Sequence, residues 1–142
     1  MKEVIEFVEE TETTIQNFDS ISSWLIKVVR EEGKTTGVIT YVFMDDESLL
    51  KFNKQYLNHE FYTDVITFDD SNFPVVNGDI LVSVDRIIDN AKQLNTDYNE
   101  EFLRVVVHGV LHLCGYKDKS ESEEKLMRQK EAYYLNKVDF SI

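Results

Sequence analysis

The 142-residue chain has little cysteine, proline or glycine, and its acidic residues far outnumber its basic ones. The single cysteine, Cys114, excludes an internal disulfide, so nothing in the sequence points to an oxidising compartment. No stretch approaches the roughly 20 apolar residues of a membrane helix, and the start MKEVIEFVEE lacks the pattern of a secretory signal. We therefore expect one globular domain over residues 1–142, located in the cytoplasm and not bound to a membrane.

The formal net charge of −12 also limits the possible partners. Tight, nonspecific binding to nucleic acid needs clustered Lys and Arg side chains against the phosphates, and this composition argues against it. A local basic patch on an otherwise acidic body is still compatible with the composition. The charge therefore restricts the mode of nucleic-acid binding more than it decides the function.

Apolar periodicity predicts a mixed succession of strands and helices. The strands are expected at residues 4–8, 38–44, 64–68 and 79–84, and the helices at 21–30, 46–57, 85–94, 101–114 and 121–136. We expect Asp19 or Ser20 to cap the first helix, and Pro74 and Asn77-Gly78 to form a turn. This order favours an α+β fold, in which a small mixed β-sheet of about four strands packs against helices.

Two of the three histidines, His108 and His112, lie four residues apart in the most apolar predicted helix. That spacing places both imidazoles on one face of the helix, where they can bind one metal ion. The alternative is a pair of core histidines, each satisfied by its own hydrogen bond. Burying two imidazoles in a Val/Leu-rich helix is costly for every unpaired nitrogen, and a metal would account for both.

The residues after the histidines strengthen the metal interpretation. The spacing H-x-x-x-H-x-x-G-x-x-D places Gly115 where a helix can end in a left-handed turn, so that Asp118 can return over the histidines. The same logic applies to the long zinc signature H-E-x-x-H-x-x-G-x-x-H, and a carboxylate is an ordinary zinc ligand. Gly109 stands where that signature has its general base, so peptidase chemistry is not expected. Gly109 can instead allow close packing of the helix.

The run HGVLHLCGYKD resembles the signature H-G-x-L-H-L-x-G-Y-D-H of the YbeY family of bacterial rRNA maturation factors. Residues 52–56 and 63–68 resemble the family segment L-N-x-x-Y…T-[DN]-V-L-[ST]-F, and residues 78–83 resemble its G-D-I-x-[IV]-S strand. The resemblance thus covers at least residues 52–118. It implies a single-strand-specific, metal-dependent endoribonuclease that acts in 3′-end maturation of small-subunit ribosomal RNA and in ribosome quality control. The implied partners are single-stranded or ribosomal RNA, the small ribosomal subunit and assembly factors.

Carried over to this chain, the resemblance implies that His108, His112 and Asp118 hold the metal, with Zn²⁺ as the expected ion. Asp118 stands where the family has its third histidine, and Lys117 where it has an aspartate. Compared with a histidine, Asp118 adds negative charge to the site, and Lys117 can offset that charge. Leu57 stands where the family has an arginine important for RNA cleavage. His59 is a weak candidate to replace that arginine, although an exposed loop histidine is the more ordinary interpretation.

No general base is evident in the sequence, so activation of water is expected to depend on the metal. Thr63, Lys117 and Arg104 are candidates for contact with the substrate, although each has an ordinary structural interpretation. The aromatic residues Phe61, Tyr62, Phe68 and Phe73 could stack on bases, but we expect them to pack in the core. We expect Cys114 to be a buried structural thiol.

Two other functions stay open at this stage. The first is a non-catalytic, metal-binding ribosome-assembly factor, which Leu57 and the net charge of −12 favour. The second is another metal-dependent hydrolase or metalloenzyme, because two histidines and one carboxylate also occur at non-haem iron.

Overall fold

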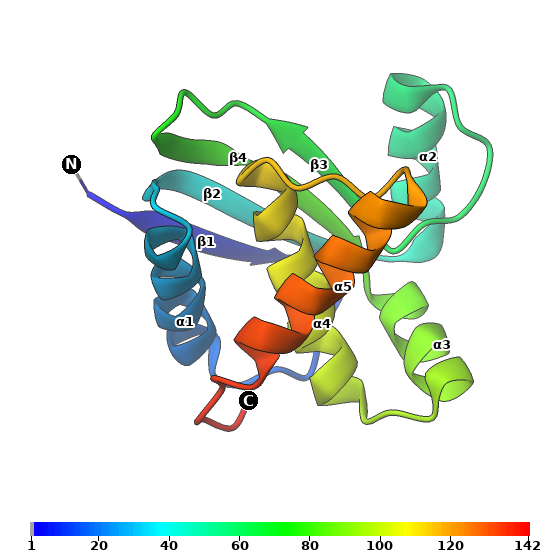
Figure 1. The fold of residues 1–142 in the computed structure, drawn as a ribbon. Coiled ribbons are helices and arrows are strands. Elements are labelled where there is room, and N and C mark those ends of the chain that lie inside the picture. The colour runs from blue at the N-terminus through cyan, green and yellow to red at the C-terminus, as the bar shows by residue number, and fades with distance from the viewer. Residues whose placement is uncertain (1) are drawn as a thin grey trace.

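The computed structural model describes residues 2–142, and within them the nine expected elements follow in the expected order (Figure 1). The strands are β1 (Val4–Glu9), β2 (Thr35–Met44), β3 (Val65–Asp69) and β4 (Val75–Ser83). The helices are α1 (Phe18–Glu31), α2 (Asp46–Leu57), α3 (Val84–Leu94), α4 (Tyr98–Leu113) and α5 (Glu121–Leu135). The α+β class predicted from the sequence is therefore confirmed, and Met1 lies outside the described residues.

The four strands form one mixed sheet in the order β1-β2-β4-β3. β1, β2 and β4 are parallel, whereas β3 runs antiparallel to β4, with Val65 opposite Val82. β3 therefore begins beside the C-terminal ends of β2 and β4. Open sheets of parallel strands bind ligands at this edge, and the segment that leads into β3 lies there.

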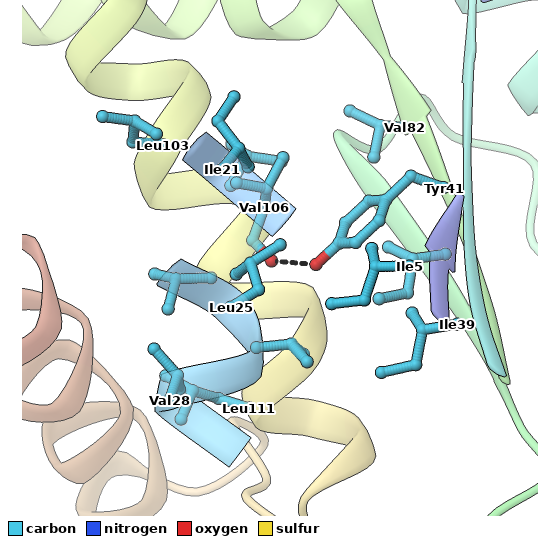
Figure 2. Packing of buried hydrophobic residues seen from close by; sticks show 14 of the residues in the cluster. Ile5, Ile21, Leu25, Val28, Ile39, Tyr41, Val82, Leu103, Val106 and Leu111 are labelled. Atoms are coloured by element: carbon cyan, nitrogen blue, oxygen red, sulfur yellow. Dashed lines mark hydrogen bonds between the residues drawn. The ribbon is translucent and has the colours of Figure 1, made fainter. Parts of the chain in front are cut away.

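One face of the sheet is covered by α1 and α4, with the main hydrophobic core between them and the strands, and α5 packs on α4 (Figure 1). The side chains of Ile39, Tyr41 and Phe43 alternate from β2 into this core, as expected for a strand with one buried face. Figure 2 shows the Tyr41 hydroxyl, which donates a hydrogen bond to the backbone carbonyl of Val106 on α4. This bond joins the sheet to the helix that carries both histidines.

α4 approaches the sheet closely because it has a glycine at the point of contact. A Cβ atom at Gly109 would lie 2.7 Å from Cγ2 of Ile80 on β4. The predicted role of Gly109 in close packing is therefore confirmed. Eleven residues of α4 are buried, in agreement with the prediction of a central helix.

The opposite face of the sheet carries a smaller apolar cluster under α2, formed by Met44, Leu49, Ile66 and Leu81. α2 stands apart from the layer of α1, α4 and α5 (Figure 1). Along the described residues, no helix has both the length and the apolar character needed to cross a lipid bilayer.

Two local predictions are wrong. Helix α1 begins at Phe18, and its N-cap is Asn17, whose side chain accepts a hydrogen bond from the backbone of Ser20, so neither Asp19 nor Ser20 caps it. Asn77 and Gly78 lie within β4 instead of in the turn before it. Asn77 Oδ1 accepts a hydrogen bond from the backbone N–H of Val38 at 2.9 Å, where the pairing of β2 and β4 changes register. The pair thus marks an irregularity in the ladder.

The expectation that the aromatic residues after α2 pack in the core is also wrong for three of four. Phe61, Tyr62 and Phe73 are 57%, 47% and 54% exposed. Only Phe68 is partly buried, against the cluster under α2. Phe61 and Tyr62 lie in the irregular segment before β3, and the strand that would alternate buried and exposed side chains begins only at Val65.

Candidate metal centre

The two histidines of α4 lie side by side on the same face of the helix. The ring centroids of His108 and His112 are 4.5 Å apart, and the rings are nearly perpendicular. His108 is buried, whereas His112 is partly exposed toward the helix end. The four-residue spacing therefore has the geometric consequence expected from the sequence.

Helix α4 ends in a turn that brings a carboxylate back over these rings. Gly115 has φ +112°, and its N–H donates to the carbonyl of His112 while the N–H of Tyr116 donates to that of Leu111. This is the double hydrogen bond of the Schellman motif, which reverses the chain direction at a helix end. As a result, Asp118 Oδ2 lies 3.4 Å from Nε2 of His108 and 3.3 Å from Nε2 of His112.

The other nitrogen of each ring is hydrogen-bonded to an acceptor. Nδ1 of His112 lies 2.9 Å from the backbone carbonyl of Tyr116, and Nδ1 of His108 lies 2.6 Å from Oε2 of Glu131. A carbonyl or carboxylate oxygen can only accept, so Nδ1 carries the proton in both rings. In each neutral imidazole, Nε2 then presents a lone pair toward Asp118.

These donors fit a divalent metal ion. The three ligand atoms all lie within 4.8 Å of one another. Zinc bonds of about 2.0–2.1 Å to nitrogen and oxygen place neighbouring ligands roughly 3.3–3.4 Å apart in a tetrahedron, close to the distances measured to Asp118. Two lone-pair nitrogens and a carboxylate would repel one another without a proton or a cation between them. The predicted ligands therefore converge as one group that could hold a metal ion.

Glu131 on α5 supports this group from behind, and sequence reasoning missed it. Its side chain is only 2% exposed, and its Oε1 accepts from Arg104 at 3.3 Å and from Arg128 at 2.9 Å. Burial alone would raise the pKa of Glu131, but the hydrogen bond with His108 and the nearby positive charges outweigh it and hold the pKa below its usual range. The carboxylate thus stays ionised and keeps the proton of His108 on Nδ1. Carboxylates that orient metal-binding histidines in this way are common.

The sequence does contain a signal for Glu131. The buried positions of α5 are Met127, Glu131 and Tyr134, at the spacing of one helical face. A glutamate on the buried stripe of a helix is almost always paired, so its presence there indicates a partner across the interface. Nothing in the sequence indicates which partner it has.

The candidate ligands line a cavity of about 260 Å³ at the sheet edge where β3 begins. Its other walls come from the end of α2 and the following segment and include Asn53, Leu57, His59, Phe61 and Thr63. Two of the candidate residues from the sequence, His59 and Thr63, therefore lie at the cavity with the histidines of α4. Leu57, the residue that the sequence resemblance matches with the family arginine, lies there too.

The two cationic candidates do not line this cavity. Lys117 is exposed on the turn before Asp118. Arg104 lies largely buried behind the site, where its guanidinium contacts Glu101 at 2.7 Å, Glu131 at 3.3 Å and Asp64 at 3.5 Å. Burial opposes its charge, but these carboxylates raise the pKa of Arg104 above its usual value. Arg104 therefore forms ion pairs with carboxylates behind the site and does not face the cavity.

Cys114 lies next to this site in the sequence but outside the group of converging donors. The side chain is buried, and burial raises the pKa of its thiol to about 12. A neutral thiol is a poor metal ligand, because the thiolate is the form that binds. The prediction of a buried thiol is therefore confirmed.

Comparison with known proteins identifies the family. The family model described as "Endoribonuclease YbeY" matches residues 5–139. The chain belongs to the YbeY family. Among its YbeY relatives, the "Endoribonuclease YbeY" of Flavobacterium johnsoniae is 48% identical over 90% of this chain and 92% of its own length. That of Karelsulcia muelleri is 41% identical over 93% and 94% of the two chains.

A solved structure supports the fold independently. The solution structure of a Thermotoga maritima protein superimposes with a TM-score of 0.68, covering 94% of this chain and 87% of that one. Its sequence is only 24% identical, so the likeness concerns the fold alone.

Proposed function

We propose that this YbeY protein is a single-domain, metal-dependent endoribonuclease over residues 1–142 and that it cleaves single-stranded RNA in the cytoplasm. The proposed process is 3′-end maturation of small-subunit ribosomal RNA and ribosome quality control, with the small subunit and assembly factors as partners. The observation that carries the proposal is the convergence of His108, His112 and Asp118 in an open cavity of a YbeY-family chain. We propose Zn²⁺ as the ion, because nitrogen and carboxylate donors at these distances suit it.

When bound, such an ion would lower the pKa of a coordinated water to about 7 and polarise a phosphoryl oxygen. The chain's own residues hold the donor atoms in place. Glu131 and the carbonyl of Tyr116 keep the protons of His108 and His112 on Nδ1, so that both Nε2 atoms face the cavity. Thr63, at the cavity wall, has a hydroxyl that can donate to a substrate oxygen.

A non-catalytic role in ribosome assembly is the second candidate, and one observation favours it. Among the described residues, the lining of the cavity includes no Lys or Arg, and Leu57 occupies the position of the family arginine. Cationic side chains usually offset the charge that develops on a phosphate during cleavage. In their absence the metal would have to supply this stabilisation alone.

The test combines elemental analysis with an RNA-cleavage assay. We expect about one equivalent of zinc or a similar ion in the purified protein and none in a His108→Ala/His112→Ala variant. His59→Ala is the matched control, because it removes the remaining histidine without touching the three donors, and its metal content should equal that of the parent. The metal-loaded parent should cleave single-stranded RNA, and a chelator should abolish the cleavage.

Each failure has a distinct meaning. A parent without metal, even after supplementation, would refute the metal centre. Bound metal without cleavage of any single-stranded RNA, alone or with small subunits, would favour the assembly factor. Bound iron and no effect on RNA would favour another metalloenzyme.

A further inference from the structure

The rim of the cavity carries aromatic rings that the core does not use. In the segment between α2 and β3, His59 and Phe61 both line the cavity and both are exposed. Their rings are stacked, with centroids 4.9 Å apart and an interplanar angle of 21°. Because the side chain of Phe61 is 57% exposed, much of its surface is open to solvent. Leu57 also lines the cavity and is 42% exposed, so the rim carries adjoining exposed apolar groups of the kind that mark a contact surface.

We propose that the stacked pair of His59 and Phe61 is a binding platform for one unpaired base of a single-stranded RNA. The inference rests on the proposed function and adds a base-binding subsite next to the metal centre. Every base has a π-face, so an aromatic platform of this kind holds single strands of different sequence. A base within a duplex has both faces covered by its neighbours, so the platform selects unpaired RNA.

The platform is held in position by contacts to α2 and α3. Asn53 is 1% exposed, and its side-chain Nδ2 donates to the backbone carbonyl of Phe61 at 2.8 Å. Its backbone carbonyl accepts a hydrogen bond from the backbone N–H of His59 at 3.0 Å. The next residue, Tyr62, donates to Glu47 and lies under the guanidinium of Arg86. A segment fixed on both sides of Phe61 loses little freedom when a base stacks on it.

The charges around the cavity favour base contacts over phosphate contacts. The described lining residues include the carboxylates of Asp64 and Asp118 and no Lys or Arg. Phosphate recognition needs such cations, whereas stacking needs none. Apart from the proposed ion, which would face a phosphate, the side chains of the cavity can therefore hold a base better than a phosphate. A consequence is that RNA binding should depend only weakly on salt concentration.

The test is fluorescence anisotropy with a labelled, single-stranded 2′-O-methyl oligoribonucleotide and the metal-loaded protein. We expect Phe61→Ala to weaken binding by about 5- to 150-fold, the effect of losing one stacked base. Phe61→Trp keeps an aromatic face and should bind at least as tightly as the parent. Phe73→Ala is the matched control, because Phe73 is similarly exposed, at 54%, but does not line the cavity. An abasic oligomer of equal length tests the role of the bases.

The platform is supported if Phe61→Ala alone weakens binding and if the abasic oligomer binds as weakly to the parent. It is refuted if Phe61→Ala binds like the parent, if Phe73→Ala weakens binding equally, if the abasic oligomer binds as well as the normal one, or if the parent binds neither. These outcomes are independent of cleavage. If the parent cleaves RNA and Phe61→Ala binds normally, the proposed function stands and the platform is refuted. If the parent binds RNA through Phe61 but never cleaves it, the platform is supported and the proposed cleavage is refuted.

Discussion

Replacing Glu131 by glutamine tests whether the buried carboxylate orients the metal centre. Glu131 accepts a hydrogen bond from His108 through Oε2 and hydrogen bonds from Arg104 and Arg128 through Oε1. All three partners are donors, and a carboxamide has only one acceptor oxygen. In either orientation the –NH₂ group of the new side chain therefore meets a donor. If it faces His108, the imidazole must accept at Nδ1 and carry its proton on Nε2, where it can no longer bind a metal.

The expected cost of Glu131→Gln is about 10- to 100-fold in metal affinity, the usual effect of losing a residue that orients a metal ligand. This range corresponds to about 1.4–2.7 kcal/mol of binding free energy. The effect should be toward the upper end, because the side chain is 2% exposed and water cannot easily replace the lost acceptor. The same change should also lower the stability of the metal-free protein, since it leaves Arg104 and Arg128 with less compensating charge.

The assay is a competition titration of metal-free protein against a chromophoric zinc indicator, with thermal unfolding of the same samples. Glu124→Gln is the surface control, because it makes the same substitution at an exposed position of α5. Glu101→Gln is the buried control, because Glu101 is also 2% exposed and pairs with Arg104 but contacts neither histidine. Unchanged zinc affinity in Glu131→Gln, or an equal loss in Glu101→Gln, would refute the orienting role.

Three further predictions concern α4 and its end. Gly109→Ala places a methyl group against Ile80 and should destabilise the protein by about 1–3 kcal/mol, seen as a lower midpoint in thermal unfolding, and an unchanged midpoint would contradict the packing. Cys114, with its pKa raised to about 12, should stay protonated at pH 8 and react with iodoacetamide only after unfolding; rapid labelling of the native protein would show that it is accessible. Gly115→Ala forces a side chain to φ +112° at a cost of about 1–3 kcal/mol, and by displacing Asp118 it should weaken zinc binding in the same competition titration. If Gly115→Ala were destabilised but bound zinc with normal affinity, the turn would not be needed to position Asp118.

The parts of the fold that follow from local pattern could be predicted from the sequence, and the parts that depend on pairing could not. The element order and the central place of α4 follow from apolar periodicity. β2 and β4 each begin several residues before the expected strands, at Thr35 and Val75, which are partners in the sheet. That pairing joins residues far apart in the chain, so no local pattern indicates it. The order β1-β2-β4-β3 is likewise a property of the assembled sheet.

The same distinction holds for the site. The convergence of His108, His112 and Asp118 was predictable because it lies within one helix and the turn at Gly115, where spacing fixes geometry. Glu131 reaches His108 from another helix, 23 residues away, and only the packing of α5 on α4 brings them together. The exposure of Phe61 does not follow from the sequence, because aromatic residues are usually buried and no local pattern indicates that this segment leaves Phe61 open to solvent.

The charges of the site and of the whole chain together explain how an acidic protein could act on RNA. Two neutral imidazoles and Asp118 would leave a bound divalent ion with a net local charge of about +1, inside a chain of formal net charge −12. At long range such a protein repels a polyanion, and at 0.15 M salt this repulsion falls off over about 8 Å. Attraction would then act only within the cavity, where a phosphate meets the ion and a base meets Phe61. A strand that cannot place a free base in the cavity would lose these contacts, so selection for single strands would follow from contacts made inside the cavity.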